Sequence, residues 1–114
     1  MEEEWKLIPN SKNYQINNFG RVRKVYANNS YKEITGNKRK NGYLVIGIQM
    51  KNGKREFFLK HRLVAELFIP HSEYEWIVRH KDNDLSNNSV DNLYWLKTDI
   101  RNRKCYLSFL KNRL

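Results

Sequence analysis

The chain has 114 residues, a length typical of one domain rather than two. Lysine and arginine total 22 against 12 acidic residues, so the formal net charge is +10. No apolar run approaches the roughly 20 residues that a membrane-spanning helix needs, and the acidic residues 2–4 are the reverse of a signal-peptide start. We therefore expect a cytoplasmic protein with no membrane partner.

Cysteine and histidine usage argues against two kinds of stabilising site. Cys105 is the single cysteine, so the chain cannot form an internal disulfide, which fits a reducing compartment. A structural zinc site needs closely spaced ligands such as a Cys-x-x-Cys pair. One cysteine and three scattered histidines offer no such pair, and the sequence therefore predicts no zinc.

The positive charge is clustered, and most acidic residues lie elsewhere, including those at residues 2–4 and 82–91. A polyanion offsets the self-repulsion of such clusters, and DNA or RNA is the commonest polyanionic partner. The pattern predicts a nucleic-acid-binding face, with a solubilising surface or a ribosome-type binder as the alternative. The clusters are Arg21, Arg23 and Lys24; Lys38, Arg39 and Lys40; and Arg101, Arg103 and Lys104 in a tail without acidic residues.

The first predicted elements are strands. Residues 14–16 and 21–25 alternate in polarity around a turn-forming segment, which predicts two short strands within residues 5–26. The polar residues 28–41 are expected to form a loop. Two β-rich runs then flank Asn52-Gly53, which predicts a hairpin closed by a type I′ turn. The two runs are residues 43–49 and 55–60.

The apolar spacing then changes to that of a helix over residues 61–69, which Pro70 stops. His61 is expected to be structural, capping or bridging the start of this helix. The order of elements predicts an α+β fold. The remaining elements are a strand over 76–78 ending at Arg79 and His80, an Asn- and Asp-rich loop over 81–92, a strand over 93–96 and a helix over 99–114.

The most distinctive motif is IVRHKDNDLSNNSVDNLYWLK, residues 77–97, in which a His ends one strand and an Asn-Leu-x-Trp strand follows an Asn-rich loop. This layout resembles the ββα-metal (His-Me finger) core of phage- and intron-type HNH homing endonucleases. Two other blocks resemble the family in the same order: the NUMOD4-like WKLIPNSKNYQINNFGRVRKV and the helix KHRLVAELFIP. The resemblance implies one unit over 1–114, with a β-rich NUMOD4-like motif at 5–26 and an HNH-like domain at 43–114.

The resemblance also assigns roles to residues. It implies that His80 is the general base that activates water, and that Asn92 holds the loop together. A neutral imidazole, with an ordinary pKa near 6.5, can accept a proton from water at physiological pH. A divalent cation, Mg²⁺ or Mn²⁺, is implied, with Asn102 as a ligand and Asp82 as a displaced ligand. The implied function is that of a DNA endonuclease or nickase in a phage-infected bacterium.

Two positions depart from the family pattern. Arg79 stands where an Asp or Asn precedes the catalytic His, and Arg101 stands six residues after Trp95, where an Asn ligand is expected. A guanidinium offers only donors, so it cannot bind a cation, but it binds phosphate well. Two functions stay open: a nuclease in which both arginines contact phosphate, and a catalytically degenerate protein that binds DNA or a protein partner as a regulator or inhibitor. The oligomeric state is not predicted.

Overall fold

The computed structural model describes residues 2–72 and 75–97, with the side chains of Glu75 and Trp76 left undescribed. The helix predicted over 99–114 lies outside the described residues, and so do Arg101, Asn102, Arg103 and Lys104. None of the helices in the described part of the chain has the length and apolarity of a membrane span.

The first sheet is antiparallel, with the strand order β1-β2-β3-β4. The two strands predicted between residues 5 and 26 are confirmed, but the loop predicted over 28–41 is wrong, because two further strands form there. β4 is exposed along most of its length, so it has no apolar alternation, and its pairing with β3 defines it instead. The strands are β1 (Trp5–Leu7), β2 (Tyr14–Asn17), β3 (Val22–Val25) and β4 (Tyr31–Ile34).

The second sheet has the order β5-β6-β7, and it contains the predicted hairpin. Its turn is not of type I′, which needs a positive φ at both central residues. Only Gly53 has a positive φ, of 85°, while its N–H donates to the carbonyl of Met50 at 2.9 Å. This is a type I turn closed by a left-handed glycine. The strands are β5 (Asn37–Lys38), β6 (Leu44–Gln49) and β7 (Arg55–Leu59).

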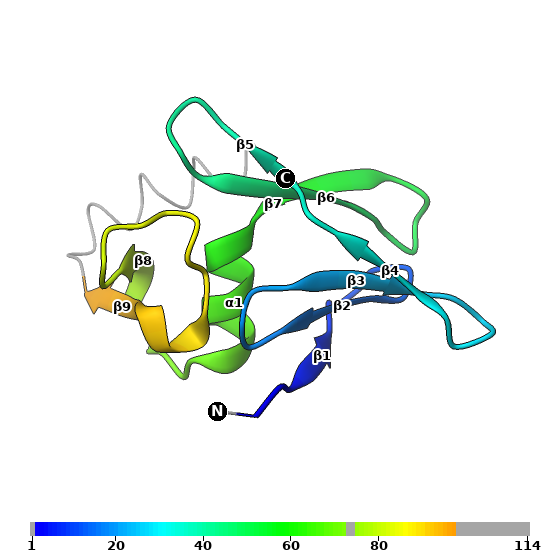
Figure 1. Ribbon diagram of the computed structural model, residues 1–114, viewed down its shortest axis with the longest axis horizontal. Helices are drawn as coiled ribbons and strands as arrows, with labels where there is room; N and C mark the ends of the chain where they lie inside the picture. The colour runs from blue at the N-terminus through cyan, green and yellow to red at the C-terminus, as the bar shows by residue number, and fades with distance from the viewer. Residues whose placement is uncertain (1, 73–74, 98–114) are drawn as a thin grey trace.

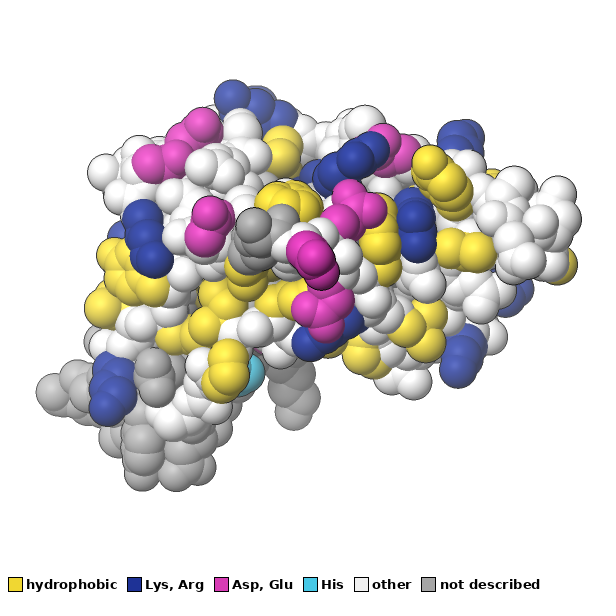
Figure 2. All heavy atoms as spheres, turned by 60° about the horizontal axis from the view of Figure 1, so that its bottom comes forward, with side chains coloured by type: hydrophobic (Ala, Val, Ile, Leu, Met, Phe, Trp, Pro, Cys, Tyr) yellow, Lys and Arg dark blue, Asp and Glu magenta, His cyan; other side chains and the backbone are white. Residues whose placement is uncertain are grey.

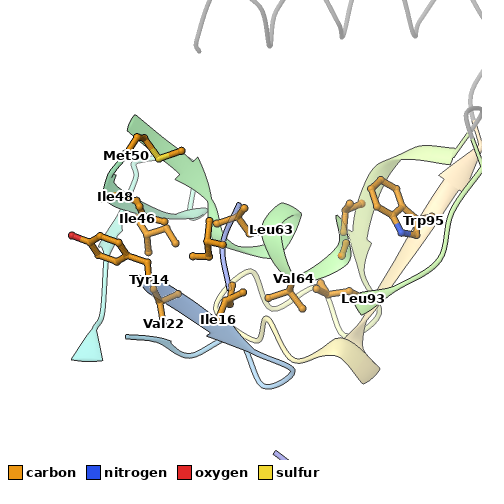
Figure 3. Packing of buried hydrophobic residues seen from close by; sticks show 13 residues of the cluster. Tyr14, Ile16, Val22, Ile46, Ile48, Met50, Leu63, Val64, Leu93 and Trp95 are labelled. Carbon is orange, nitrogen blue, oxygen red and sulfur yellow. The ribbon is translucent and has the colours of Figure 1, made fainter. Parts of the chain in front are cut away.

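The helix α1 (Lys60–Phe68) lies at the centre of the molecule, between the two sheets and the last pair of strands (Figure 1). Its buried side chains Leu63, Val64 and Ala65 lie one turn or less apart and face the core. Figure 3 shows apolar side chains from β2, β3, β6, α1 and β9 meeting in one cluster. The N-terminal sheet and the C-terminal strands therefore share a single hydrophobic core.

The last two strands form a separate antiparallel pair, β8 (Glu75–His80) and β9 (Leu93–Lys97), as predicted from the sequence. A loop over residues 81–89 and a short 3₁₀ helix, η1 (Val90–Asn92), connect them. This loop (yellow in Figure 1) lies beside the turn between β2 and β3, where the N–H of Val90 donates to the carbonyl of Asn18 at 2.8 Å. The N-terminal sheet thus touches the connection between β8 and β9, which is part of the HNH-like motif.

Candidate active site

His80 owes its position to the alternation of side chains along β8. Successive side chains of a strand point to opposite faces, so Val78 and His80 face the interior while Arg79 between them is exposed. His80 is 6% exposed and lies opposite Leu93 of β9. The residue that departs from the family pattern therefore points to solvent, and its neighbour points into the site.

The His80 ring is held by side chains from three segments. Its Nε2 lies 2.7 Å from Oδ1 of Asn88, in the loop after β8. On the other side the ring centroid of His61, from α1, lies 5.0 Å away, and Tyr43 stacks on His61 at 4.9 Å. His80, Tyr43 and Arg79 line a pocket of about 260 Å³, so a small polar group can reach the histidine side of the site.

Asn92 connects the two ends of the loop. Its Nδ2 donates to Oδ1 of Asp82 at 2.9 Å and to the carbonyl of Asn87 at 2.8 Å, and its Oδ1 accepts a bond from the Asp82 N–H at 3.2 Å. Asn92 is 8% exposed, whereas its partner Asp82 is exposed, so these bonds are partly buried. Asn92 therefore ties the start of the loop, next to His80, to its middle and its end.

Asp82 faces the loop and uses both carboxylate oxygens there. Oδ2 accepts a bond from Asn87 Nδ2 at 2.9 Å, and Oδ1 accepts from the Asp84 N–H at 2.8 Å as well as from Asn92. The side-chain bond from Asn87, followed by the bonds from Asp84 and Asn92, holds the pKa of Asp82 below its usual range. A role as a cation ligand would compete with these bonds.

The divalent cation implied by the resemblance finds few ligands in the part of the chain that the structure describes. No group of three or more His, Cys, Asp or Glu side chains is assembled there. Arg79, at the family's ligand position, has only donors to offer. The described residues by themselves do not fit a cation site, and Asn102 lies outside them.

Two of the predicted DNA-binding arginines are engaged within the first sheet. Arg21 makes two bonds to the carboxylate of Glu33, at 2.9 and 3.0 Å, and these bonds raise the pKa of Arg21. The guanidinium of Arg23 lies 3.8 Å from the ring centroid of Trp5, and its Nε donates to Gln15 at 2.8 Å. Counting these charges as free phosphate ligands therefore overestimates the positive potential of this sheet.

The other described basic cluster is open to solvent. Lys38, Arg39 and Lys40 are exposed in β5 and the connection to β6, while Lys24 is half-buried over the Tyr14 ring.

Figure 2 shows one face of the molecule, where acidic side chains run across the middle with basic ones on both sides. A face of mixed charge matches DNA poorly, so we expect DNA to approach a different face.

His61 is a buried histidine. The sequence analysis predicted a structural role for it but not its ring contacts. The predicted cap at the helix start is wrong, because Leu59 is the N-cap residue and no side chain caps this end. The ring instead packs between Tyr43 and His80. Burial, followed by the nearby His80 and Arg62, lowers the pKa of His61 from 6.5 to about 4.

The neutral state of His61 predicts a loss of stability in acid. Between pH 6.5 and about 4 the unfolded chain binds a proton that the folded chain excludes, so the free energy of unfolding falls as the pH falls. The expected loss approaches about 3 kcal/mol at pH 4. Urea unfolding of wild type and His61→Phe at several pH values measures it, because phenylalanine keeps the stack on Tyr43 and does not titrate.

The loss should disappear in His61→Phe and persist in His71→Phe, which changes an exposed histidine. Glu33 and Asp82 do not obscure the result. Their pKa values are lowered from 4.5 and 3.8, so their contributions are also lost in acid, but equally in wild type and His61→Phe, and they cancel in the comparison. An equal acid loss in wild type and His61→Phe would contradict the prediction.

Sequence reasoning missed the contact of Asn88, a residue of the predicted Asn- and Asp-rich loop, and the ring contact between His61 and His80. Neither has a local signal. Asn88 is one of several Asn and Asp residues in the loop, and only the fold shows which of them reaches the His80 ring. The loop bonds of Asn92 and Asp82 lie within the motif that the sequence singled out.

Two family models match separate parts of the chain. The model of the HNH endonuclease family matches residues 58–103, and that of the NUMOD4 motif matches residues 3–49. The chain is 39% identical over 98 residues to the DNA endonuclease I-HmuI of Bacillus phage SP01, covering 85% of this chain and 54% of that protein. It is 36% identical over 93 residues to the H-N-H endonuclease F-TflII of Escherichia phage T5, covering 80% and 46%.

A solved structure is also similar. It describes DNA binding and cleavage by the HNH homing endonuclease I-HmuI, and it aligns with a TM-score of 0.68 at 32% identity over 97% of this chain and 60% of that one. The chain spans about half the length of the two curated relatives. These matches confirm the resemblance and the α+β fold that the sequence predicted. The chain is thus similar to phage-type HNH homing endonucleases, with a NUMOD4 motif ahead of its HNH part.

Proposed function

We propose that the chain is a DNA endonuclease or nickase that hydrolyses a phosphodiester bond with His80 as the general base. The observation that carries this proposal is the setting of His80: a buried ring at the end of β8, bonded to Asn88 and lining a pocket beside Arg79. A general base must be held within reach of the water it activates, and this ring is held by the bond to Asn88 and the contact with His61. The similar protein I-HmuI is a DNA endonuclease, which supports DNA as the substrate.

The described residues account for two parts of the reaction. The oxygen of a water molecule bonds to phosphorus as the bond to the leaving oxygen breaks, and the imidazole of His80 takes the proton of that water. Arg79 is exposed on the rim of the pocket, where its guanidinium can bind a phosphate oxygen. Asn92 keeps the loop, and with it the end of β8, in one conformation.

HNH nucleases generally use a divalent metal ion. We propose Mg²⁺ or Mn²⁺ for this chain, with Asn102 as the leading ligand and Asp82 as a displaced one. We also propose that the basic residues form the DNA-binding surface, that residues 1–114 act as one unit and that the protein works in the host cytoplasm. The basic residues are Arg21, Arg23, Lys24, Lys38, Arg39, Lys40, Arg79, Arg101, Arg103 and Lys104.

Incubation of the full chain with supercoiled plasmid and Mg²⁺ or Mn²⁺ tests the proposed activity. The expected product is open circular or linear DNA, and EDTA should prevent its formation. A mobility-shift assay of the same samples separates binding from cleavage. If the plasmid is bound but stays supercoiled with both metals, the proposed nuclease activity is refuted. The second candidate function then takes its place.

The second candidate is a catalytically degenerate HNH protein that binds DNA or a protein partner as a regulator or inhibitor. One observation favours it: Arg79 occupies a position where the family has a metal ligand, and its cationic side chain is exposed beside the pocket. A cation at this position repels a metal ion, although it also attracts the phosphate group of DNA.

Replacing Arg79 by Asp is expected to raise Mn²⁺ affinity by about tenfold or more, because the change removes a repelling charge and adds an oxygen ligand. Calorimetric titration with Mn²⁺ measures the affinity, and plasmid nicking is followed in parallel. Arg79→Ala is the matched control, since it removes the charge without adding a ligand. Tight Mn²⁺ binding by wild type, with nicking lost in Arg79→Asp, would show that Arg79 is a working phosphate ligand in an intact nuclease.

A further inference from the structure

Asn88 differs from the other asparagines of the loop in what it binds. Asn87 and Asn92 bond to loop atoms, whereas the Oδ1 of Asn88 lies 2.7 Å from Nε2 of His80. Asn88 is 4% exposed, and within the described part of the chain its Nδ2 has no hydrogen-bond partner. Burying an amide is costly when half of it stays unbonded, so the bond to His80 is the interaction that explains this position.

This bond has a chemical consequence for the His80 ring. An amide oxygen only accepts, so the ring proton must reside on Nε2. In a neutral imidazole the other nitrogen, Nδ1, is then unprotonated and free to accept a proton. With Oδ1 facing Nε2, the geometry favours one tautomer of His80.

The turn between β2 and β3 holds Asn88 in place. Gly20 in this turn has a φ of 84°, and a Cβ atom there would lie 2.8 Å from the carbonyl oxygen and 3.1 Å from the Cβ of Asn88. Close by, the carbonyl of Asn18 accepts the bond from the Val90 N–H at 2.8 Å. Asn17 stabilises the turn itself, because its Oδ1 accepts bonds from the N–H groups of Phe19 and Arg21.

We propose that this turn of the NUMOD4 motif is a structural part of the nuclease centre: Gly20 sets the position of Asn88, and Asn88 fixes the tautomer and orientation of His80. Asn88 and Gly20 are positioning residues in this proposal. The catalytic part rests on the proposed function, whereas the tautomer is a property of the free protein. The two can therefore fail separately.

Nitrogen-15 NMR of the full chain, labelled at histidine and measured near pH 8, tests the tautomer. His80 signals, assigned with His80→Ala, are expected to show a protonated Nε2 and an unprotonated Nδ1. Asn88→Ala should give a mixture of tautomers, and Asn88→Asp, which keeps an accepting oxygen, should restore the wild-type pattern. A proton on Nδ1 of wild-type His80, or signals unchanged in Asn88→Ala, would overturn the proposal.

Gly20→Ala tests the contact with the turn, and Gly53→Ala is its matched control. Both glycines have a positive φ, 84° and 85°, but a Cβ at Gly53 would meet no atom within 4 Å. We expect Gly20→Ala to change the His80 signals and to lower the nicking rate on the order of ten- to hundredfold, with little change in KM. Gly53→Ala should leave the signals and the rate unchanged.

The outcomes are distinguishable even if a variant fails. Folded Gly20→Ala with wild-type His80 signals would refute the role of the turn. If Gly20→Ala does not fold, the Asn88→Ala and Asn88→Asp pair still decides whether Asn88 sets the tautomer. A chain that never nicks plasmid but shows the expected NMR pattern would refute the proposed activity and leave the positioning of His80 intact.

Discussion

Replacing His80 by Ala is expected to lower plasmid nicking by about 10²–10⁴-fold, the usual effect of losing a positioned general base. DNA binding should remain nearly intact, because His80 is buried and the basic side chains are unchanged. The measurement is the initial rate of open-circle formation with Mg²⁺ or Mn²⁺, compared with a mobility shift on the same DNA. Stability should fall by about 1–3 kcal/mol, because Asn88 loses its partner in the buried site.

The matched control is His71→Ala. His71 is exposed and stacks on Trp95 with ring centroids 4.1 Å apart, and it does not line the pocket. Its loss should leave the nicking rate close to wild type. Equal residual nicking in wild type and His80→Ala would instead mean that the activity comes from a contaminant and that His80 is structural.

The affinity for DNA is expected to fall steeply with salt and to depend little on sequence. Five phosphate contacts give a slope of about −4 or steeper for log K against log salt, which lowers the affinity by roughly two to three orders of magnitude between 50 and 200 mM salt. Fluorescence anisotropy with two unrelated duplexes measures the slope. A flat slope, or no affinity at low salt, would contradict the nucleic-acid interpretation as a whole.

The structure identifies which described residues should carry this slope. Replacing Lys38, Arg39 and Lys40 together by Ala should reduce the slope by about three units, because all three are exposed. Arg21→Ala should change it by less than the ~0.9 of one full phosphate contact, because Glu33 already neutralises that charge. The reverse ranking would place DNA on the first sheet instead of the β5–β6 connection.

The elements that the sequence predicted correctly are those whose pattern is local. The hairpin of β6 and β7 has a turn glycine between two apolar runs, and α1 has its apolar face and Pro70 at its end. β1, β4 and β5 were missed because they are short, and β4 and β5 are also largely exposed, so pairing with a neighbour rather than burial makes them strands. The turn type was wrong because Asn52 uses its side chain to bond the Lys54 N–H instead of adopting a positive φ.

The candidate site likewise contains residues that the sequence could predict and residues that it could not. His80 and Asn92 could be named from the sequence, because the motif that contains them is contiguous. The contacts of Asn88 and His61 depend on segments distant in the chain, so no local pattern predicts them. The sequence analysis counted Arg21 and Arg23 as free charges. It could not show that the fold places Glu33 beside Arg21 and the Trp5 ring beside Arg23.

A core shared by the two motifs constrains how the family can diversify. Ile16 of the NUMOD4 motif packs in the same cluster as Val64 and Leu93 of the HNH part, so a change of volume on one side must be matched on the other. Neither motif can be exchanged for a relative's without refitting its counterpart. Substitutions in the exposed β4 and β5 segments, by contrast, cost little stability and need no matching change in the other motif.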